Sequence, residues 1–323
     1  MAVRQNNAVP FSDRENVLSN GQNILPCVDS TSTKSVHPKP LSTQFTSTDF
    51  IQQITSQGYC HIPTVYSSEQ VDHALSLIKQ VYEQSNDKLT KNIPFLNRNH
   101  PMVYNLENKD AYFLEMLFAP QIVHQILMHF LNDKSYRSIP QDQPNYILRS
   151  FLARSSRDAL PLHIDSFMPY IADESFIMQV AIVLEDQDEE NGCTIVMPRS
   201  HQSGEYADRA RNDECIPLYS KAGDVLIWDS RLWHGTLANV SETRTRWAAI
   251  ATLSRWWIKQ NFNTTENVPQ SIYEQLTDNQ KAVVGFCSIP FCDETQGIDI
   301  RQGHDALLPE ATDYRSARQY HHS

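Results

Sequence analysis

The sequence has too few basic residues to suit a polyanionic partner. Its 323 residues include 27 lysines and arginines against 38 aspartates and glutamates, which leaves a formal net charge of −11. The local basic cluster of Arg149, Arg154 and Arg157 is short and interleaved with apolar residues. An acidic chain without a long basic run binds nucleic acid and anionic membranes poorly. We therefore expect a small-molecule substrate, with no nucleic acid and no membrane as partners.

Paired cysteine motifs, a secretion signal and long apolar runs are missing as well. The six cysteines are scattered, none forms a C-x-x-C pair, and "CSIPFC" has the wrong spacing for a zinc knuckle. No basic stretch followed by an apolar one opens the chain, as it would in a signal peptide. No apolar run approaches the length of a membrane span. These absences predict a soluble, cytoplasmic protein and leave its oligomeric state open.

Changes in composition along the chain predict three segments. Residues 1–44 are rich in Ser, Thr, Asn, Gln and Pro and lack apolar periodicity, which predicts a disordered or loosely packed arm. Residues 45–295 are expected to form a single domain, because a hydrophobic content of 40% allows a large core. Residues 296–323 are polar and are expected to form a C-terminal tail.

Helical patterns dominate residues 45–135. Ser47 or Thr48 is expected to cap a short helix that Gly58 ends. The following "CHIPTVY" predicts a strand, and "SSEQVDHALSLIKQVYEQSN" has apolar residues at helical spacing. In "KDAYFLEMLFAPQIVHQILMHFLND" the pattern predicts two helices separated at Pro120.

Strand patterns dominate residues 143–258. The runs "NYILRSFLAR", "SFIMQVAIVLE", "CTIVMP", "DVLIWDS", "LWHGTLA" and "RWAAIATLSRWW" alternate with turn residues. Their short spacing, with no helix between them, favours an antiparallel jelly roll over a βαβ fold. The predicted fold class is α+β, mainly β: a double-stranded β-helix (jelly roll, cupin-like) with an N-terminal helical layer. A last helix is expected at about residues 269–285, and no internal repeat is present.

The stretch "PLHIDSF" contains a histidine and an aspartate two residues apart, His163 and Asp165. Both side chains should face the same space, because residues i and i+2 of an extended segment point to one side. One such pair is expected by chance, so it is weak evidence alone. His234, in "GDVLIWDSRLWHGTLANVSETRTRW", can be brought beside the pair by a jelly roll. Two imidazoles and a carboxylate on one face suit iron(II) that must also bind a co-substrate and dioxygen.

Two arginines, Arg244 and Arg246, follow His234. An oxidase that uses a 2-oxo diacid needs a fixed cation for the distal carboxylate. Arginine suits this role because its planar fork binds a carboxylate bidentately and keeps its charge when buried. Arg246 leads the apolar run "RWAAIATL", where a charge needs a partner. A strand end at the surface, or a structural salt bridge, is the alternative for Arg246. Arg149 and Arg154 are expected at solvated strand ends, with contact to an anionic substrate group as their alternative.

These segments resemble the phytanoyl-CoA dioxygenase-like (PhyH) family of iron(II)/2-oxoglutarate-dependent oxygenases. The likeness runs through "LPLHIDS", "ENGCTIVMPRSH", "GDVLIWDSRLWHGTLANVSETRTRW" and "VPQSIYEQLT", in that order, over roughly residues 45–290. The resemblance implies that the catalytic iron ligands are His163, Asp165 and His234. It also implies that Arg246, assisted by the Thr236 hydroxyl, binds the distal carboxylate of 2-oxoglutarate.

The sequence departs from the family pattern at three places. Arg199 stands where the family usually has glycine, and Thr236 replaces a serine while keeping its hydroxyl. The loop "ANVSETRTR" is longer than usual, which leaves Arg244 as the alternative to Arg246. In a regular strand the side chains of Arg244 and Arg246 would point to the same face, so strand geometry does not distinguish them. Arg246 is preferred because "RW" followed by an apolar strand fits the family pattern. His201 is implied to shape the site without binding iron.

The resemblance implies oxidation of an unactivated C–H bond by hydroxylation, desaturation or oxidative ring closure. Iron(II), 2-oxoglutarate and dioxygen are required, and ascorbate is a helpful reductant. Asp165 fills the position that a halogenase leaves free for halide, so halogenation is not expected. The acidic charge favours a small natural product over the alternative, an acyl-CoA, whose phosphates need a basic groove. A non-catalytic jelly-roll module would have lost a ligand or the arginine, and a cupin-type isomerase or hydrolase would add His or Glu ligands.

Overall fold

The computed structural model describes residues 45–89, 101–135, 139 and 142–286. The predicted arm at 1–44 and the tail at 296–323 lie outside these residues, so both stay predictions, as does the domain boundary at 45–295. The α-helices of the described residues are α1 (Ser47–Gln57), α2 (Ser68–Leu89), α3 (Ala111–Phe118), α4 (Gln121–Leu131), α5 (Thr264–Asn267), α6 (Gln270–Tyr273) and α7 (Asp278–Val284).

The strands form two antiparallel sheets, which confirms the predicted jelly roll. A six-stranded sheet has the order β1-β8-β5-β10-β3-β2, and a four-stranded sheet has the order β4-β9-β6-β7. The strands are β1 (Tyr59–Ile62), β2 (Met102–Tyr104), β3 (Tyr146–Arg154), β4 (Leu160–His163), β5 (Ile177–Val183), β6 (Thr194–Val196), β7 (Ile216–Leu218), β8 (Val225–Asp229), β9 (His234–Thr236) and β10 (Ala248–Arg255).

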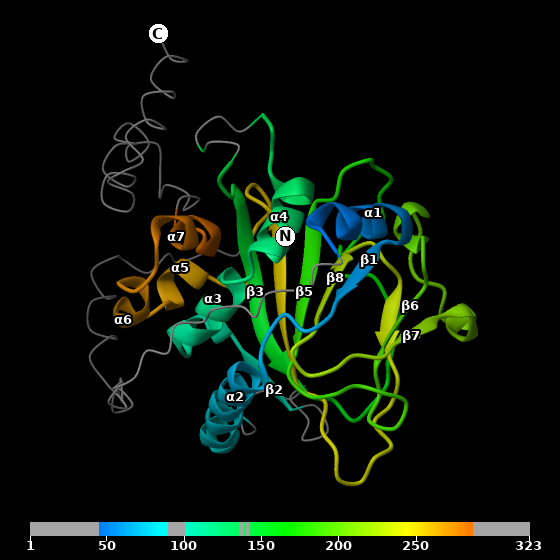
Figure 1. Cartoon of the computed structure of the whole chain (residues 1–323), viewed down its shortest axis with the longest axis horizontal. Coiled ribbons are helices and arrows are strands. Elements are labelled where there is room, and N and C mark those ends of the chain that lie inside the picture. Colours follow the sequence, from blue (N-terminus) through cyan, green and yellow to red (C-terminus); the bar gives the residue numbers. More distant parts are fainter. Residues whose placement is uncertain (1–44, 90–100, 136–138, 140–141, 287–323) are drawn as a thin grey trace, which may run out of the picture. The chain divides into compact units, whose positions relative to one another are not determined.

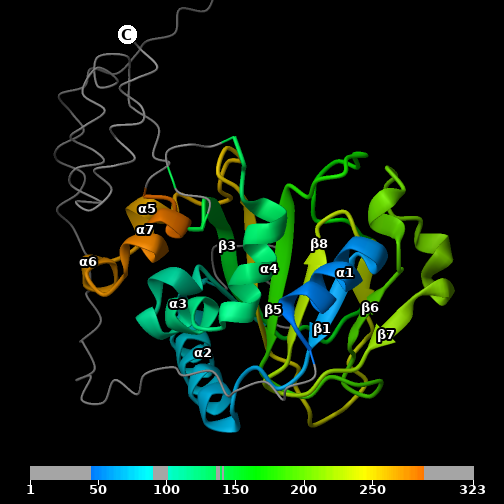
Figure 2. The same ribbon diagram turned by 45° about the horizontal axis from the view of Figure 1, so that its top comes forward.

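Both faces of the large sheet are covered, and this explains its unbroken apolar strands. All seven residues of β5 are buried, so its sequence lacks the alternation of a half-exposed strand. One face packs on the helices in a core that contains Phe50, Ile78 and Val180. The opposite face packs on the small sheet through a second cluster that contains Ala181 and Leu226. Figures 1 and 2 show α1 and α4 on one side of the large sheet and β6 and β7 on the other.

The first helix begins one residue earlier than either predicted cap. Thr46 is the N-cap, and its hydroxyl accepts a hydrogen bond from the Asp49 N–H at 3.4 Å. The Asp49 carboxylate accepts in return from the Thr46 N–H at 2.7 Å. This reciprocal capping box requires an acceptor three residues after the cap, and Asp49 supplies it to Thr46. Gly58 ends the helix with φ 90°, as predicted.

The single C-terminal helix predicted at 269–285 is wrong. The segment forms two short helices, α6 and α7, and α5 precedes them. Thr277 interrupts the segment because its extended backbone (ψ 162°) starts a new capping box with Gln280. The prediction also missed β2 and β7, because three residues carry too little alternation to be recognised.

Candidate metal centre

Strand pairing brings the three predicted iron ligands together. His163 ends β4 and His234 begins β9, and the two residues are Cα partners in the antiparallel register. Asp165 lies just beyond β4, where its N–H donates to the Ser230 carbonyl at 2.8 Å. That bond ties the turn after β4 to the turn before β9. One ligand atom from each of the three residues lies within 4.8 Å of the other two.

Both histidines are oriented by the backbone two residues before them. The Nδ1–H of His163 donates to the Pro161 carbonyl at 2.9 Å, and the Nδ1–H of His234 donates to the Leu232 carbonyl at 2.9 Å. A carbonyl oxygen can only accept, so the proton sits on Nδ1 and the Nε2 lone pair is free to bind metal. The two Nε2 atoms lie 3.4 and 3.2 Å from the Asp165 carboxylate.

The charges of the triad stabilise one another. Burial by itself would raise the pKa of Asp165, but the neighbouring His234 and His163 outweigh it and lower that pKa below its ordinary value. Burial would lower the pKa of His234, and the Asp165 carboxylate outweighs this and raises it. An anionic carboxylate beside two imidazoles is the donor set of a mononuclear iron(II) site. The residues present therefore fit the metal that the sequence implies.

The donor set has no further protein ligand among the residues that the structure describes. The group consists of two histidines and one aspartate, with no fourth His, Cys, Asp or Glu. His234 is buried, whereas His163 and Asp165 are partly exposed, so the site has an accessible side. A cupin-type hydrolase or isomerase would add His or Glu ligands, so the described site does not support that alternative.

Arg246 lies buried next to the metal ligands and uses all of its donors. Its side chain is 5% exposed, and Thr236 beside it is two residues from His234 on β9. Its N–H groups donate to four backbone carbonyls and one hydroxyl: Ser156 at 2.6 Å, Gly192 at 3.0 Å, Leu237 at 2.7 Å, Asp158 at 3.0 Å and Thr236 Oγ1 at 3.5 Å. No carboxylate of the described residues pairs with it. Burial, followed by the charge of Arg154, lowers the pKa of Arg246 to about 10.

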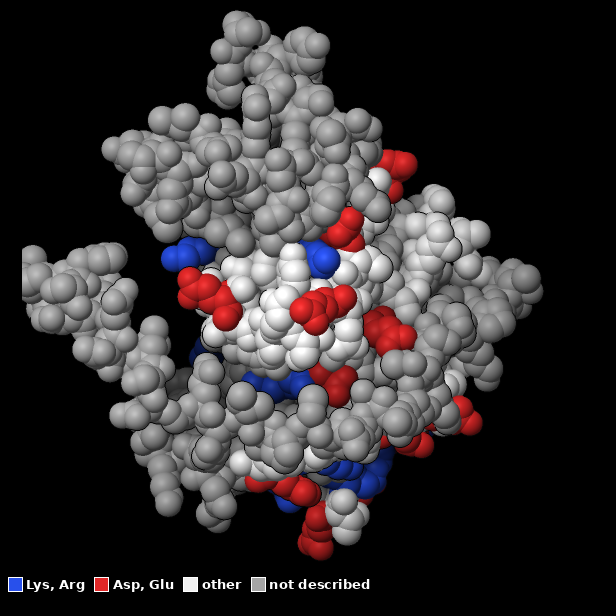
Figure 3. All heavy atoms as spheres, turned by 90° about the vertical axis from the view of Figure 1, so that its left-hand side faces the viewer, with Lys and Arg blue, Asp and Glu red and all other residues white. Residues whose placement is uncertain are grey.

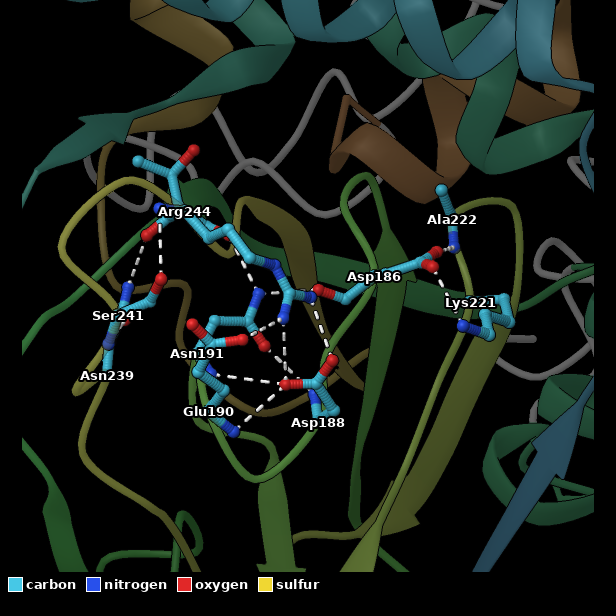
Figure 4. Close-up of polar contacts among 10 residues, drawn as sticks. Asp186, Asp188, Glu190, Asn191, Lys221, Ala222, Asn239, Ser241 and Arg244 are labelled. Carbon is cyan, nitrogen blue, oxygen red and sulfur yellow. Dashed lines mark hydrogen bonds and ion pairs between the residues drawn. The ribbon is translucent and has the colours of Figure 1, made fainter.

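Arg244 points away from the ligands into a surface network. Its guanidinium pairs with Asp188 at 2.8 Å and with Glu190 at 3.1 Å, and all three side chains are substantially exposed. Figure 4 shows this network together with Asn191, whose side chain donates to backbone carbonyls nearby. Of the two arginines considered from the sequence, Arg246 is the one that faces Thr236.

His201 and Arg199 lie on the side of the fold occupied by α1. The Nε2 of buried His201 approaches the Thr55 carbonyl at 3.3 Å, and Gly58 leaves room for its ring. His201 is absent from the metal-binding group. Arg199 has φ 71°, the left-handed region that glycine adopts without strain. The turn thus keeps the conformation expected of glycine although an arginine occupies it.

Exposed apolar side chains surround the approach to Asp165. Phe167 and Met168, just after the aspartate, are 67% and 64% exposed. Ile171 and Tyr206 are also exposed, and the Tyr206 hydroxyl donates to the Phe167 carbonyl at 3.4 Å. Phe167 has φ 62°, an uncommon and strained conformation for a bulky residue.

Two further arginines and a tryptophan face the interior beside the triad. Arg149 is buried, with its guanidinium 4.7 Å from the Phe167 ring centroid, and Arg154 is partly buried. The expectation of a solvated strand end is therefore wrong for Arg149, whereas Arg154 does end β3 and is partly buried. Trp228, whose ring lies 5.2 Å from that of His234, was not predicted at the site. No alternation marks it, because all five residues of β8 are buried.

The described surface carries charges of both signs. Figure 3 shows acidic and basic side chains interspersed on the face that carries the helices, without a continuous basic area among the described residues of that view. In the part of the chain that the structure describes, no helix is both long and apolar enough to cross a membrane.

Comparisons with known proteins agree with this geometry. The family profile described as Phytanoyl-CoA dioxygenase (PhyH) matches residues 54–248. Dioxygenase af480 of Aspergillus fumigatus is 25% identical over 245 residues, which are 74% of this chain and 76% of that protein. Dioxygenase himG of Aspergillus japonicus is 26% identical over 170 residues, 47% of this chain and 52% of that protein.

Two solved structures show the same fold. The epimerase SnoN, in complex with Fe3+, alpha ketoglutarate and nogalamycin RO, has a TM-score of 0.51 at 14% identity, covering 70% of this chain and 91% of SnoN. HygX from Streptomyces hygroscopicus, with nickel and 2-oxoglutarate bound, has a TM-score of 0.51 at 15% identity, covering 68% of this chain and 90% of HygX. The jelly roll seen in the two sheets is thus shared with non-heme enzymes.

Proposed function

The chain belongs to the phytanoyl-CoA dioxygenase (PhyH) family, and we propose that it oxidises an unactivated C–H bond of an apolar small metabolite. Its class is that of an iron(II)/2-oxoglutarate-dependent dioxygenase, as expected from the sequence, with iron and 2-oxoglutarate as the cofactors of that class. The product is a hydroxylated, desaturated or ring-closed compound. The observation that carries the proposal is the convergence of two Nε2 atoms and a carboxylate beside an exposed apolar rim.

Each residue of the site has a defined task in this proposal. His163, Asp165 and His234 would hold iron(II), with no further ligand from the described residues, so 2-oxoglutarate and dioxygen could also bind. Bound iron(II), with 2-oxoglutarate and dioxygen, supplies the oxidising power for C–H cleavage and releases succinate and carbon dioxide. Arg246 would supply the positive charge that attracts the distal carboxylate, and Thr236 would supply a hydroxyl donor, since the N–H groups of Arg246 already donate to protein acceptors. Thr236 reaches it because side chains two apart on β9 lie on one face, about 7 Å from each other.

The rim supports an apolar substrate. Apolar surface is exposed beside the site by four side chains: Phe167, Met168, Ile171 and Tyr206. Contact between these side chains and an apolar substrate would exclude water from the reacting carbon. A terpenoid or amino-acid-derived natural product fits this surface better than the phosphates of a CoA ester.

A reducing compartment, the cytoplasm, is the proposed location. The three described cysteines, Cys60, Cys193 and Cys215, are all free thiols. Free thiols are typical of proteins that work where glutathione keeps cysteine reduced.

An anaerobic titration tests the metal and co-substrate assignment. Iron(II) and 2-oxoglutarate added to the metal-free protein should produce the visible charge-transfer band of the chelate. His234→Ala should abolish the band, whereas the control His73→Ala, on the exposed side of α2, should keep it. Absence of the band in folded wild-type protein would contradict the proposed function. Succinate release with a panel of terpenoids, amino-acid derivatives and acyl-CoA esters then tests the substrate class.

A further inference from the structure

Arg154 is a guanidinium on the inner side of the large sheet. It is the last residue of β3, where it pairs with Ala248 of β10 and Met102 of β2. The preceding residue, Ala153, belongs to the core that packs on the helices. Successive side chains of a strand point to opposite faces, so Arg154 points to the interior between the sheets. The metal ligands occupy that interior.

Arg154 has no hydrogen bond or ion pair with any described residue, which distinguishes it from other arginines near the site. Arg231 pairs with Asp229 at 2.7 Å, and Arg255 pairs with Glu174 at 2.8 Å. Arg154 is nevertheless partly buried. Burial lowers its pKa, and Tyr104 and Asp165 only partly oppose that effect. A guanidinium withdrawn from water without a partner is unfavourable, so its retention indicates an anionic ligand.

The neighbours of Arg154 show where that ligand would lie. Arg246 contacts the two residues that directly follow Arg154: its backbone N–H donates to the Ser155 hydroxyl at 3.0 Å, and its side chain donates to the Ser156 carbonyl at 2.6 Å. Arg246 uses every N–H on the protein, and its contact with Thr236 is the longest at 3.5 Å. Among the described residues of this region, free guanidinium donors therefore belong to Arg154 and to Arg149, whose Nε–H alone is bonded, to the Lys259 carbonyl at 3.0 Å.

We propose that Arg154 binds a carboxylate of 2-oxoglutarate, as a second guanidinium beside Arg246. This inference rests on the proposed function. A carboxylate between the two arginines offsets two cations that have no anionic partner among the described residues, and it receives a planar pair of N–H donors from Arg154. A carboxylate of the organic substrate has the same chemistry and is the alternative source, which the experiment separates.

Calorimetry on the nickel(II)-loaded protein tests the proposal without turnover. Two ligands are compared: 2-oxoglutarate, and 2-oxopentanoate, which has the same carbon chain but lacks the distal carboxylate. The variants are Arg154→Gln and the control Arg157→Gln, which removes an exposed arginine three residues away. Arg154→Gln should raise the Kd of 2-oxoglutarate about tenfold or more, whereas Arg157→Gln should change it less than about twofold. Arg154→Lys, which keeps the charge but loses the fork, should lie between them.

The pattern across the two ligands decides the outcome. Loss of affinity for 2-oxoglutarate alone assigns Arg154 to the distal carboxylate, and loss for both ligands assigns it to the keto-acid end. Unchanged affinity for both overturns the proposal and leaves Arg154 for a substrate anion. Failure of the wild type to bind 2-oxoglutarate would overturn the proposed function as well.

The unfolding midpoint of Arg154→Gln should equal or exceed that of the wild type, because an unpartnered residue is removed. If Arg154 had a structural role instead, the substitution would lower the unfolding midpoint.

Discussion

Arg244 and Arg246 stand two residues apart before β10, yet their environments are opposite. Arg244 is partly exposed and pairs with two carboxylates. Arg246 is buried and bonds only to neutral carbonyls and a hydroxyl. Glu107, elsewhere in the chain, is also buried, at 1% exposed, but neither of its carboxylate oxygens has a hydrogen-bond partner, whereas the N–H groups of Arg246 all have one. Of these three charges, the more exposed Arg244 is paired with carboxylates and the buried Arg246 and Glu107 are not, although the buried Arg231 and Asp229 do pair with each other.

In this protein, the presence of an ion pair is therefore a poor guide to how much a charged residue contributes to stability. Exposed pairs are screened by water and contribute little to stability. A buried charge that bonds to backbone carbonyls determines where several loops run, because each of those carbonyls loses its partner if the charge is removed. Three substitutions test this difference, in order of expected effect.

Arg246→Gln should cause the largest loss. It would leave several buried carbonyls of the 156–158 and 237 segments without donors, and we expect the free energy of unfolding to fall by about 3 kcal/mol or more. Urea denaturation of the metal-free protein measures this. A loss below about 1 kcal/mol would show that Arg246 does not organise these loops. Arg246→Lys, which retains the charge, should recover only part of the stability because it lacks the planar fork.

Glu107→Gln should change how stability depends on pH. Burial raises the pKa of Glu107 from 4.5 to about 7, so the folded protein retains a proton that the unfolded chain releases. The wild type should therefore lose stability as the pH rises from about 4.5 to about 7, by an amount on the order of 3 kcal/mol. Glu107→Gln should remove this slope and be the more stable protein at pH 8. Parallel pH profiles of the two proteins would show that Glu107 does not titrate in this range.

Arg244→Gln should have the smallest effect at neutral pH, because ion pairs in contact with water contribute little to stability. The Arg244 guanidinium lowers the pKa of Asp188 below its ordinary value of 3.8. The stabilisation is therefore present above about pH 4 and is lost as the pH falls through the lowered pKa. Thermal unfolding of both proteins at pH 7 and pH 3 should show a small difference that disappears at the lower pH. Arg244→Gln should bind 2-oxoglutarate with the wild-type affinity. A large loss of that affinity would show that Arg244, and not only Arg246, contributes to the co-substrate site.

Local sequence patterns were sufficient where neighbouring residues determine the conformation. Gly58 ends α1 because glycine adopts positive φ without strain, and Pro120 separates α3 from α4 because it lacks an N–H. The cap of α1 and the C-terminal helix were mispredicted because several Ser and Thr residues compete as caps, and the hydrogen bonds that select one are three-dimensional. The candidate metal ligands were predicted from the spacing of His163 and Asp165 together with a family resemblance, and the structure places His234 beside His163.

The sequence by itself determined the jelly roll, since strand length, turn spacing and apolar runs are local properties of the chain. It also supplied the chemistry of the site, because residue types define which atoms can bind iron. Only the tertiary structure decided which arginine faces the interior. Residues two apart point to the same face only in a regular strand. The segment between β9 and β10 is not a regular strand, so Arg244 and Arg246 need not face the same side. Their environments are decided by contacts with segments far away in the sequence: Arg244 contacts Asp188, and Arg246 contacts Ser156.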